Sequence, residues 1–283
     1  MKKELDFFYI GDSYGGNQDW CLDHMMQLGG CGAVTACDCS IYFKLRMGIA
    51  KAYPGSLASP ASFFSEINMP PSRSVLHEDS MISESVPPEP FYVVDGESAL
   101  PEMNLPKPLS VIDGEITMPV DVQDAPFFQG PGAALGIDRD TYIHFTEIMK
   151  PYLHPRWSGI DKLYLFTEGL ARYYEEQGIT EIEMEEFDGG NDVQEAMRRI
   201  REQLDQGYPI PCLILNHRNA AMEDYVWHWF LLVGYEVDDQ DSSGEDFMVK
   251  TATYSEANWV RLRDLWNTGF PVKGGLILFH RNY

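Results

Sequence analysis

The chain has 283 residues, of which 44 are acidic and 21 basic, so its formal charge is −23. This charge argues against binding to nucleic acid or to an anionic membrane surface, because no basic stripe offsets it. No segment approaches the roughly 18 continuous apolar residues of a membrane span, and Glu4 and Asp6 interrupt the apolar run that a signal peptide would need. We expect a soluble, cytoplasmic protein with reduced cysteines and with neither a nucleic-acid nor a membrane partner.

The first 53 residues contain a short apolar segment, a polar loop and a buried helix. Residues 5–10 are apolar, and residues 11–30 are polar and rich in glycine. Residues 31–53 carry few helix breakers and an apolar stripe, which predicts a largely buried helix. Gly29 and Gly30 precede this helix and predict a tight turn.

Residues 54–136 have a different character. Thirteen of the 18 prolines lie between Pro54 and Pro131. Two segments, PFYVVDGESALP at 90–101 and PLSVIDGEITMP at 108–119, share the template P-x-x-V-[VI]-D-G-E-x-x-x-P. Two copies bury little apolar surface, which predicts an acidic, proline-rich, partly disordered insertion; the alternative is an ordered arm that docks a partner.

After the insertion, helical patterns are followed mostly by β-type patterns. The expected helices cover residues 138–149, 161–177 and 192–206, and the expected strands cover 179–187, 210–215, 226–237, 246–253 and 275–280. Helices that precede the strands of an antiparallel sheet indicate an α+β domain. We expect this domain to be discontinuous, with residues 1–53 and 137–283 on either side of the insertion.

Cys31, in the stretch QLGGCGAVTACDCS, stands where the buried helix should begin. A helix N-terminus stabilises an anion through its dipole and free N–H groups, which would lower the pKa of a thiol there. The same N–H groups could receive an oxyanion. Cys31 is therefore a candidate nucleophile.

His228 lies near the start of the apolar segment VWHWFLLVGYEV, which predicts a strand buried on both faces. A polar imidazole in such a strand needs a partner or a cleft. Taken alone, the residue fits a core histidine bonded to backbone; a nucleophile elsewhere makes it a candidate general base.

Three stretches carry a resemblance to a known family: NQDW at 17–20, GGCGAVTA at 29–36 and HWFLLVGY at 228–235. Their order and spacing resemble the papain-like cysteine peptidases, and most closely the group related to the bacteriocin-leader (double-glycine) peptidases. The resemblance implies a papain-like fold, with the cysteine on an N-terminal helix and the histidine on a C-terminal antiparallel sheet. It also implies that Cys31 is the nucleophile and that His228 is the general base and acid.

The resemblance leaves two roles less defined. Gln18 matches the family's glutamine of the oxyanion hole, and Gln27, which is nearer to Cys31 in sequence, is the alternative. Thr251, in FMVKTATYSEANW, stands where the family has the Asn or Asp that orients the imidazole. A hydroxyl accepts that hydrogen bond without balancing an imidazolium charge, and Asp238 or Asp246 could substitute for it in space.

The sequence thus favours a thiol hydrolase that acts on a peptide or amide through an acyl-enzyme on Cys31. The alternatives are an acyltransferase that uses the same Cys–His pair on an acyl substrate, and a degenerate papain-like module that only binds a peptide. Cys21, Cys37 and Cys39 form no C-x-x-C pair, which is a spacing typical of zinc ligands. We therefore expect neither a metal nor another cofactor. Cys212 fits a buried residue of a strand.

Overall fold

A computed structural model describes residues 1–54, 136–238 and 245–282 of the chain, and these residues belong to one compact unit. The expected insertion at 54–136 and its two repeats lie, apart from the two end residues, outside the described part. None of the described helices is long and apolar enough to cross a membrane.

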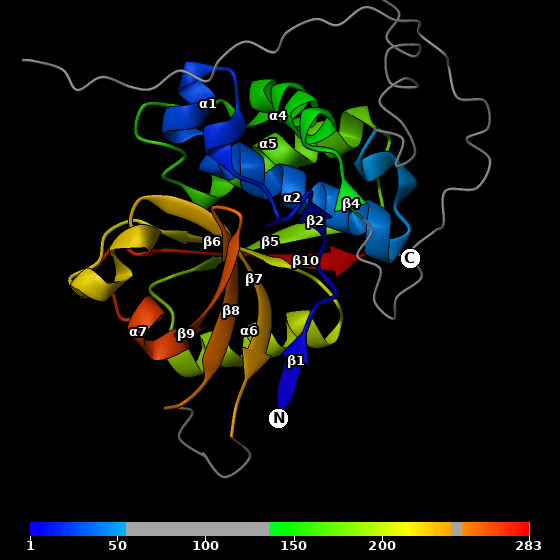
Figure 1. The fold of residues 1–283 in the computed structure, drawn as a ribbon. Helices are drawn as coiled ribbons and strands as arrows, with labels where there is room; N and C mark the ends of the chain where they lie inside the picture. The colour runs from blue at the N-terminus through cyan, green and yellow to red at the C-terminus, as the bar shows by residue number, and fades with distance from the viewer. Residues whose placement is uncertain (55–135, 239–244, 283) are drawn as a thin grey trace, which may run out of the picture. The chain divides into compact units, whose positions relative to one another are not determined.

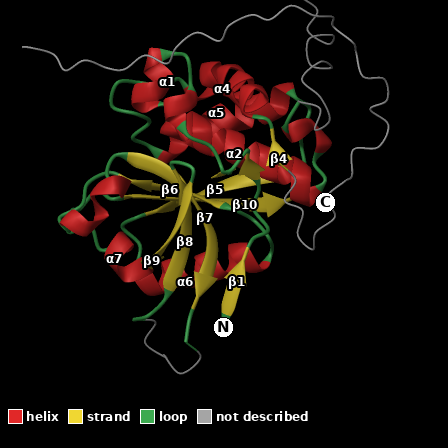
Figure 2. Ribbon diagram, viewed as in Figure 1, coloured by secondary structure: helices red, strands yellow, loops and turns green. Residues whose placement is uncertain are grey.

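The centre of the fold is an antiparallel sheet of seven strands among the described residues, in the order β5-β10-β6-β7-β8-β9 with β1 also paired to β7 (Figures 1 and 2). Its strands are β1 (Lys2–Glu4), β5 (Ile182–Asp188), β6 (Ile210–Ile214), β7 (His228–Glu236), β8 (Met248–Thr253), β9 (Glu256–Arg261) and β10 (Gly274–Arg281). A second, small sheet has the order β3-β2-β4, built from β2 (Tyr9–Ile10), β3 (Ser13–Tyr14) and β4 (Gly136–Ile137). The expectation of an α+β architecture with an antiparallel sheet is confirmed.

The helices fall into two groups (Figure 1). The first group contains α1 (His24–Gly29), α2 (Cys31–Met47), α4 (Arg139–Leu153) and α5 (Leu163–Glu176), of which α2, α4 and α5 pack on one another. The second contains α6 (Val193–Asp205) and α7 (Leu262–Trp266), which contact each other. Three short 3₁₀ turns complete the described elements: η1 (Gln18–Trp20), η2 (Ala50–Ala52) and η3 (Ala220–Tyr225).

Helix α2 is buried along most of its length, from Cys31 to Phe43. It packs against β7, so the first turn of α2 lies next to the start of β7. The first residue of the helix is Cys31 and the first residue of the strand is His228. This packing brings together the two candidate residues that lie 197 positions apart in sequence.

Several local expectations need correction. The loop expected at 11–30 contains the helix α1, which begins after Asp23, whose side chain accepts a hydrogen bond from the N–H of Met26. The helix expected at 31–53 ends at Met47, because Gly48 adopts a left-handed conformation and closes it. Residues 256–266, for which no element was expected, form β9 and α7.

Gly29 and Gly30 are required by close packing rather than by a turn with positive φ. A Cβ on Gly29 would lie 1.8 Å from the carbonyl oxygen of Arg156, and a Cβ on Gly30 would lie 2.2 Å from that of Met26. Gly29 therefore lets the loop around residue 156 approach the start of α2.

Candidate functional site

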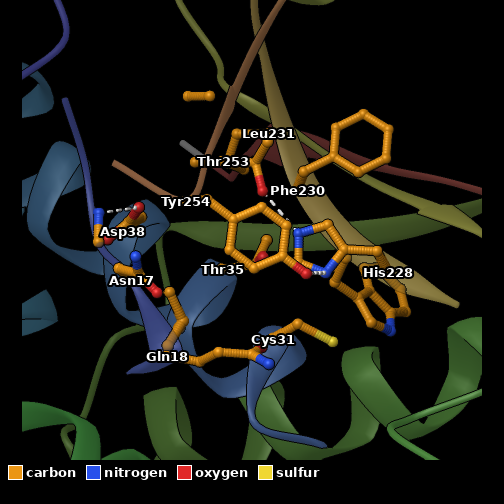
Figure 3. Close-up of a pocket in the computed structure, with 14 residues that line it drawn as sticks. Asn17, Gln18, Cys31, Thr35, Asp38, His228, Phe230, Leu231, Thr253 and Tyr254 are labelled. Atoms are coloured by element: carbon orange, nitrogen blue, oxygen red, sulfur yellow. Dashed lines mark hydrogen bonds between the residues drawn. The ribbon is translucent and has the colours of Figure 1, made fainter. Parts of the chain in front are cut away.

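Cys31, His228 and Gln18 line a common cleft of about 380 Å³. Cys31 comes from the start of α2, His228 from the start of β7, and Gln18 from the turn η1. The remaining wall is formed by Leu28, Gly29, Trp157, Ser158, Gly159, Trp227 and Tyr254. The same three residues also border a small adjoining cavity of about 20 Å³, which is room for about one water molecule. Figure 3 shows the residues around this second cavity.

The thiol of Cys31 is buried, with 5% of the residue exposed. Burial raises the pKa of this thiol above its usual value, and the backbone N–H groups of Trp229, Gly32 and Cys31 itself oppose the rise. The expectation that the helix start lowers the pKa is therefore wrong for this structure, because desolvation of the thiolate outweighs the N–H groups. Cys31 is a neutral thiol at pH 7.

The imidazole of His228 is also buried, and burial lowers its pKa to about 4. No carboxylate among the described residues forms an ion pair or hydrogen bond with it. The structure gives no hydrogen bond between the imidazole and Sγ of Cys31; the groups near its two nitrogens are the hydroxyls of Thr253 and Tyr254. At neutral pH the site holds a neutral thiol and a neutral base.

Thr253, and not Thr251, contacts the imidazole. Oγ1 of Thr253 lies 2.6 Å from Nε2 of His228 (Figure 3). Thr251 hydrogen-bonds instead to the hydroxyl of Tyr225 and donates to the carbonyl of Asn258.

The register of the sheet explains this correction. Thr251 pairs with Leu232 across β7 and β8. Leu232 is four residues beyond His228, which corresponds to about 13 Å along the strand. Thr253 is two residues closer to the level of His228 and on the same face of β8 as Thr251.

The ring of Tyr254 stacks on His228, with ring centres 4.4 Å apart and planes inclined by 6°. The hydroxyl of Tyr254 lies 3.3 Å from Nδ1. Parallel rings in van der Waals contact are about 3.5 Å apart, so the line from the Tyr254 hydroxyl to Nδ1 runs roughly perpendicular to the imidazole plane. The lone pair of an imidazole nitrogen lies in the ring plane, and Nδ1 therefore keeps its in-plane direction for another partner. In Figure 3, Thr253 lies on one side of the ring and Cys31 on the other.

Two aromatic residues of the cleft have left-handed backbones. Trp227, directly before His228, has φ 53°, and Tyr254, directly after Thr253, has φ 48°. A non-glycine residue in this region is strained by roughly 1–3 kcal/mol and is held there by its surroundings. The N–H of Trp227 donates to the carbonyl of Leu215. Tyr254 and Ser255 (φ 69°) are the two residues between the paired Thr253 and Glu256, so their positive φ belongs to the hairpin turn that joins β8 to β9. Left-handed backbone thus directly precedes His228 and directly follows Thr253.

The two candidate glutamines differ in position. The Nε2 group of Gln18 donates to the carbonyl of Gln27, which leaves one N–H of the amide for a ligand. Oε1 of Gln18 is buried and has no hydrogen-bond partner. The side chain of Gln27 donates to the carbonyl of Cys21 and does not line the cleft. The geometry favours Gln18, with Gln27 as the residue that holds it.

Asp38 is an ionisable residue of the site that was not predicted from the sequence. It lies on α2 seven residues after Cys31, on the same helical face, and borders the small cavity. Its carboxylate accepts hydrogen bonds from the N–H of Gly16 at 3.0 Å and the hydroxyl of Tyr142 at 2.8 Å. Burial raises the pKa of Asp38 to about 7. The signal in the sequence was an acidic residue inside an otherwise uncharged buried stretch, VTACDCSIYF.

The other cysteines lie apart from this chemistry. Cys21, Cys37, Cys39 and Cys212 are free and buried. The described residues contain no group of three or more His, Cys, Asp or Glu side chains placed to hold a metal ion. Asp238 and Asp246, the alternative partners of His228, are not among the groups that contact its ring nitrogens.

Comparison with known proteins adds no relative: no protein-family model, no curated protein and no solved structure matches the chain.

Proposed function

We propose that the protein is a papain-like thiol hydrolase that forms an acyl-enzyme on Cys31 from a peptide, amide or ester. The observation that carries the proposal is the common cleft, in which a thiol at a helix start, an imidazole and a glutamine amide converge. A nucleophile, a base and an oxyanion donor are the three groups that acyl transfer requires.

In the proposed reaction, the sulfur of Cys31 attacks the substrate carbonyl while Nδ1 of His228 accepts the thiol proton. The neutral imidazole, whose pKa is about 4, is free to accept that proton at pH 7. When the N–H at Nε2 donates to Thr253, Nδ1 is the unprotonated nitrogen. His228 then returns the proton to the leaving group as its bond to the carbonyl carbon breaks.

Oxyanion stabilisation falls to Gln18 and to the N–H groups at the start of α2. The Gln18 amide has one N–H engaged by Gln27 and a second that can donate to the carbonyl oxygen as it gains charge. Attack of water on the resulting thioester, with His228 again as base, releases the acid and restores the thiol. Attack by a different nucleophile would make the same site an acyltransferase.

A second candidate, a papain-like module that binds a peptide without catalysis, is favoured by a specific observation. The partner of His228 is the neutral hydroxyl of Thr253, where a carboxylate would stabilise an imidazolium. Burial moreover shifts the pKa values of Cys31 and His228 away from a thiolate–imidazolium pair.

Burst kinetics with p-nitrophenyl acetate separate the two candidates. The hydrolase should release one equivalent of p-nitrophenolate per chain in a first phase, and Cys31→Ala should abolish that phase. We expect His228→Ala to slow it by about 100-fold or more, as loss of a general base does. A binding module would release p-nitrophenolate at the same rate with and without His228.

A further inference from the structure

Asp38 does no chemistry in the proposed reaction, yet it is buried, with 5% of the residue exposed, and lies two helical turns after the nucleophile on the same face of α2. A buried carboxylate is costly unless hydrogen bonds satisfy it. Two donors supply these bonds: the backbone N–H of Gly16 and the hydroxyl of Tyr142 on α4. The bond to Gly16 connects Asp38 to the loop that carries Gln18.

Gly16 lies two residues before Gln18 and is bonded on both sides. Its N–H donates to Asp38, and its carbonyl accepts from the N–H of Ser255 at 3.3 Å. Ser255 directly follows Tyr254, the residue stacked on His228. One peptide segment therefore joins α2, the loop that carries Gln18, and the turn that covers the imidazole.

Close packing leaves no room for a side chain at Gly16. A Cβ on Gly16 would lie 1.8 Å from the hydroxyl of Tyr142 and 2.9 Å from Oδ1 of Asp38. Asn17 then caps η1 by accepting from the N–H of Asp19, so Gln18 starts the turn in a defined direction. The position of the Gln18 backbone thus depends on contacts that end at Asp38.

We propose that Asp38 is a positioning residue, which fixes the Gln18 loop through Gly16 relative to Cys31 and to the turn over His228. This inference rests on the proposed function, because the loop is argued to place the oxyanion donor. Loss of Asp38 should therefore impair reactions that build negative charge on a carbonyl oxygen. Reactions of the Cys31 thiol that develop no such charge should be much less affected.

Two reagents separate these effects in the full chain. p-Nitrophenyl acetate acylates Cys31 through an oxyanion, whereas iodoacetamide alkylates the thiol by displacement of iodide at carbon, without one. Asp38→Ala should slow acetylation of Cys31 by about 10-fold or more and alter its alkylation by less than about threefold. Ser40→Ala is the matched control, since Ser40 is a buried polar residue of α2 that bonds to Ala36 and Tyr174, away from the loop. It should leave the ratio of the two rates unchanged.

Asp38→Asn should rescue the ratio. The amide oxygen can accept from the N–H of Gly16, and the amide nitrogen can donate to Tyr142, whose hydroxyl is then free to donate to the carbonyl of Val34, 3.4 Å away. This variant also guards against a folding defect in Asp38→Ala. The inference is overturned if Asp38→Ala slows both reactions alike or neither, or if Asp38→Asn is as impaired as Asp38→Ala.

Amide hydrogen exchange distinguishes failure of the inference from failure of the proposed function. If wild-type Cys31 is acetylated no faster than Cys37, the proposed function fails, and with it any effect of Asp38 on the reaction of Cys31. If wild-type Cys31 is acetylated, the N–H of Gly16 should exchange about 10-fold faster in Asp38→Ala than in wild type, with Asp38→Asn close to wild type. Equal exchange in all three proteins would show that Asp38 does not hold the loop.

Discussion

Nε2 of His228 lies 2.6 Å from Oγ1 of Thr253, so a hydroxyl orients the buried imidazole of this site. A hydroxyl can accept a hydrogen bond from Nε2–H or donate one to an unprotonated Nε2, and it carries no charge in either case. The imidazole therefore gains orientation from Thr253 but little stabilisation of its protonated form. This property distinguishes the site from one in which a carboxylate backs the histidine.

Thr253→Ala should slow acetylation of Cys31 by about 10-fold, because the imidazole loses the hydrogen bond that fixes its ring. Thr253→Ser keeps the hydroxyl and should recover most of the rate. Thr251→Ala is the control: Thr251 bonds to Tyr225 and Asn258, so its loss should lower the free energy of unfolding by about 1 kcal/mol without changing the rate. If Thr251→Ala slowed acetylation and Thr253→Ala did not, Thr251 would be the residue that orients the imidazole.

The pH dependence of acetylation should reflect the lowered pKa of His228, which is about 4. The base is neutral above that value, so its contribution should persist as the pH falls to about 5 and be lost as the pH falls through about 4. With the ordinary histidine pKa of about 6.5, the activity would be lost about 2.5 pH units higher. Stopped-flow acetylation between pH 3.5 and 8 measures this. If the rate instead fell on the acid side with a midpoint near pH 6.5, the imidazole would not be buried as deeply as in the structure.

The folded protein should lose stability as the pH rises toward 7, through Asp38. Burial raises the pKa of this carboxyl from 3.8 to about 7, so between these values the folded state binds more protons than the unfolded state. Asp38→Asn removes the ionisation and should flatten this part of the profile. The variant should be more stable than wild type at pH 8 by a few kcal/mol, and the difference should shrink toward pH 5. Urea denaturation at several pH values tests this, and parallel profiles for the two proteins would contradict it.

Trp227 offers a test of the strained backbone beside His228. Because its φ is 53°, glycine should fit the position better than alanine, although glycine is elsewhere the less stabilising of the two. We expect Trp227→Gly to be more stable than Trp227→Ala by about 0.5–1 kcal/mol in urea denaturation. The reverse order would show that Trp227 does not need the left-handed conformation.

The sequence predicted those features that depend on local patterns. The apolar run of residues 226–237 identified the strand of His228, and the glycines before Cys31 identified the start of its helix. The face formed by Val193, Ala196 and Met197 identified α6, in which these residues are buried. Each of these features follows from the spacing of residues within one element.

The sequence did not predict features that depend on how elements meet. The choice between Thr251 and Thr253 depends on the register between β7 and β8, which shifts between Leu232 and Gly234. Asp38 acquires its partners only when the loop of Gly16 and the helix α4 pack on α2. The sequence predicted a lowered pKa for Cys31, whereas burial raises it. The depth of burial is a property of the packed molecule, and its effect on the pKa outweighs that of the helix N-terminus.

The central claim, that Cys31 forms an acyl-enzyme, is tested most directly by locating the adduct. Wild-type protein treated briefly with p-nitrophenyl acetate should gain one acetyl group, which peptide mass mapping should place on Cys31 and which hydroxylamine should remove. The buried residues Cys37, Cys39 and Cys212 serve as controls within the same chain. An unmodified Cys31, or one modified to the same extent as these three, would contradict the claim.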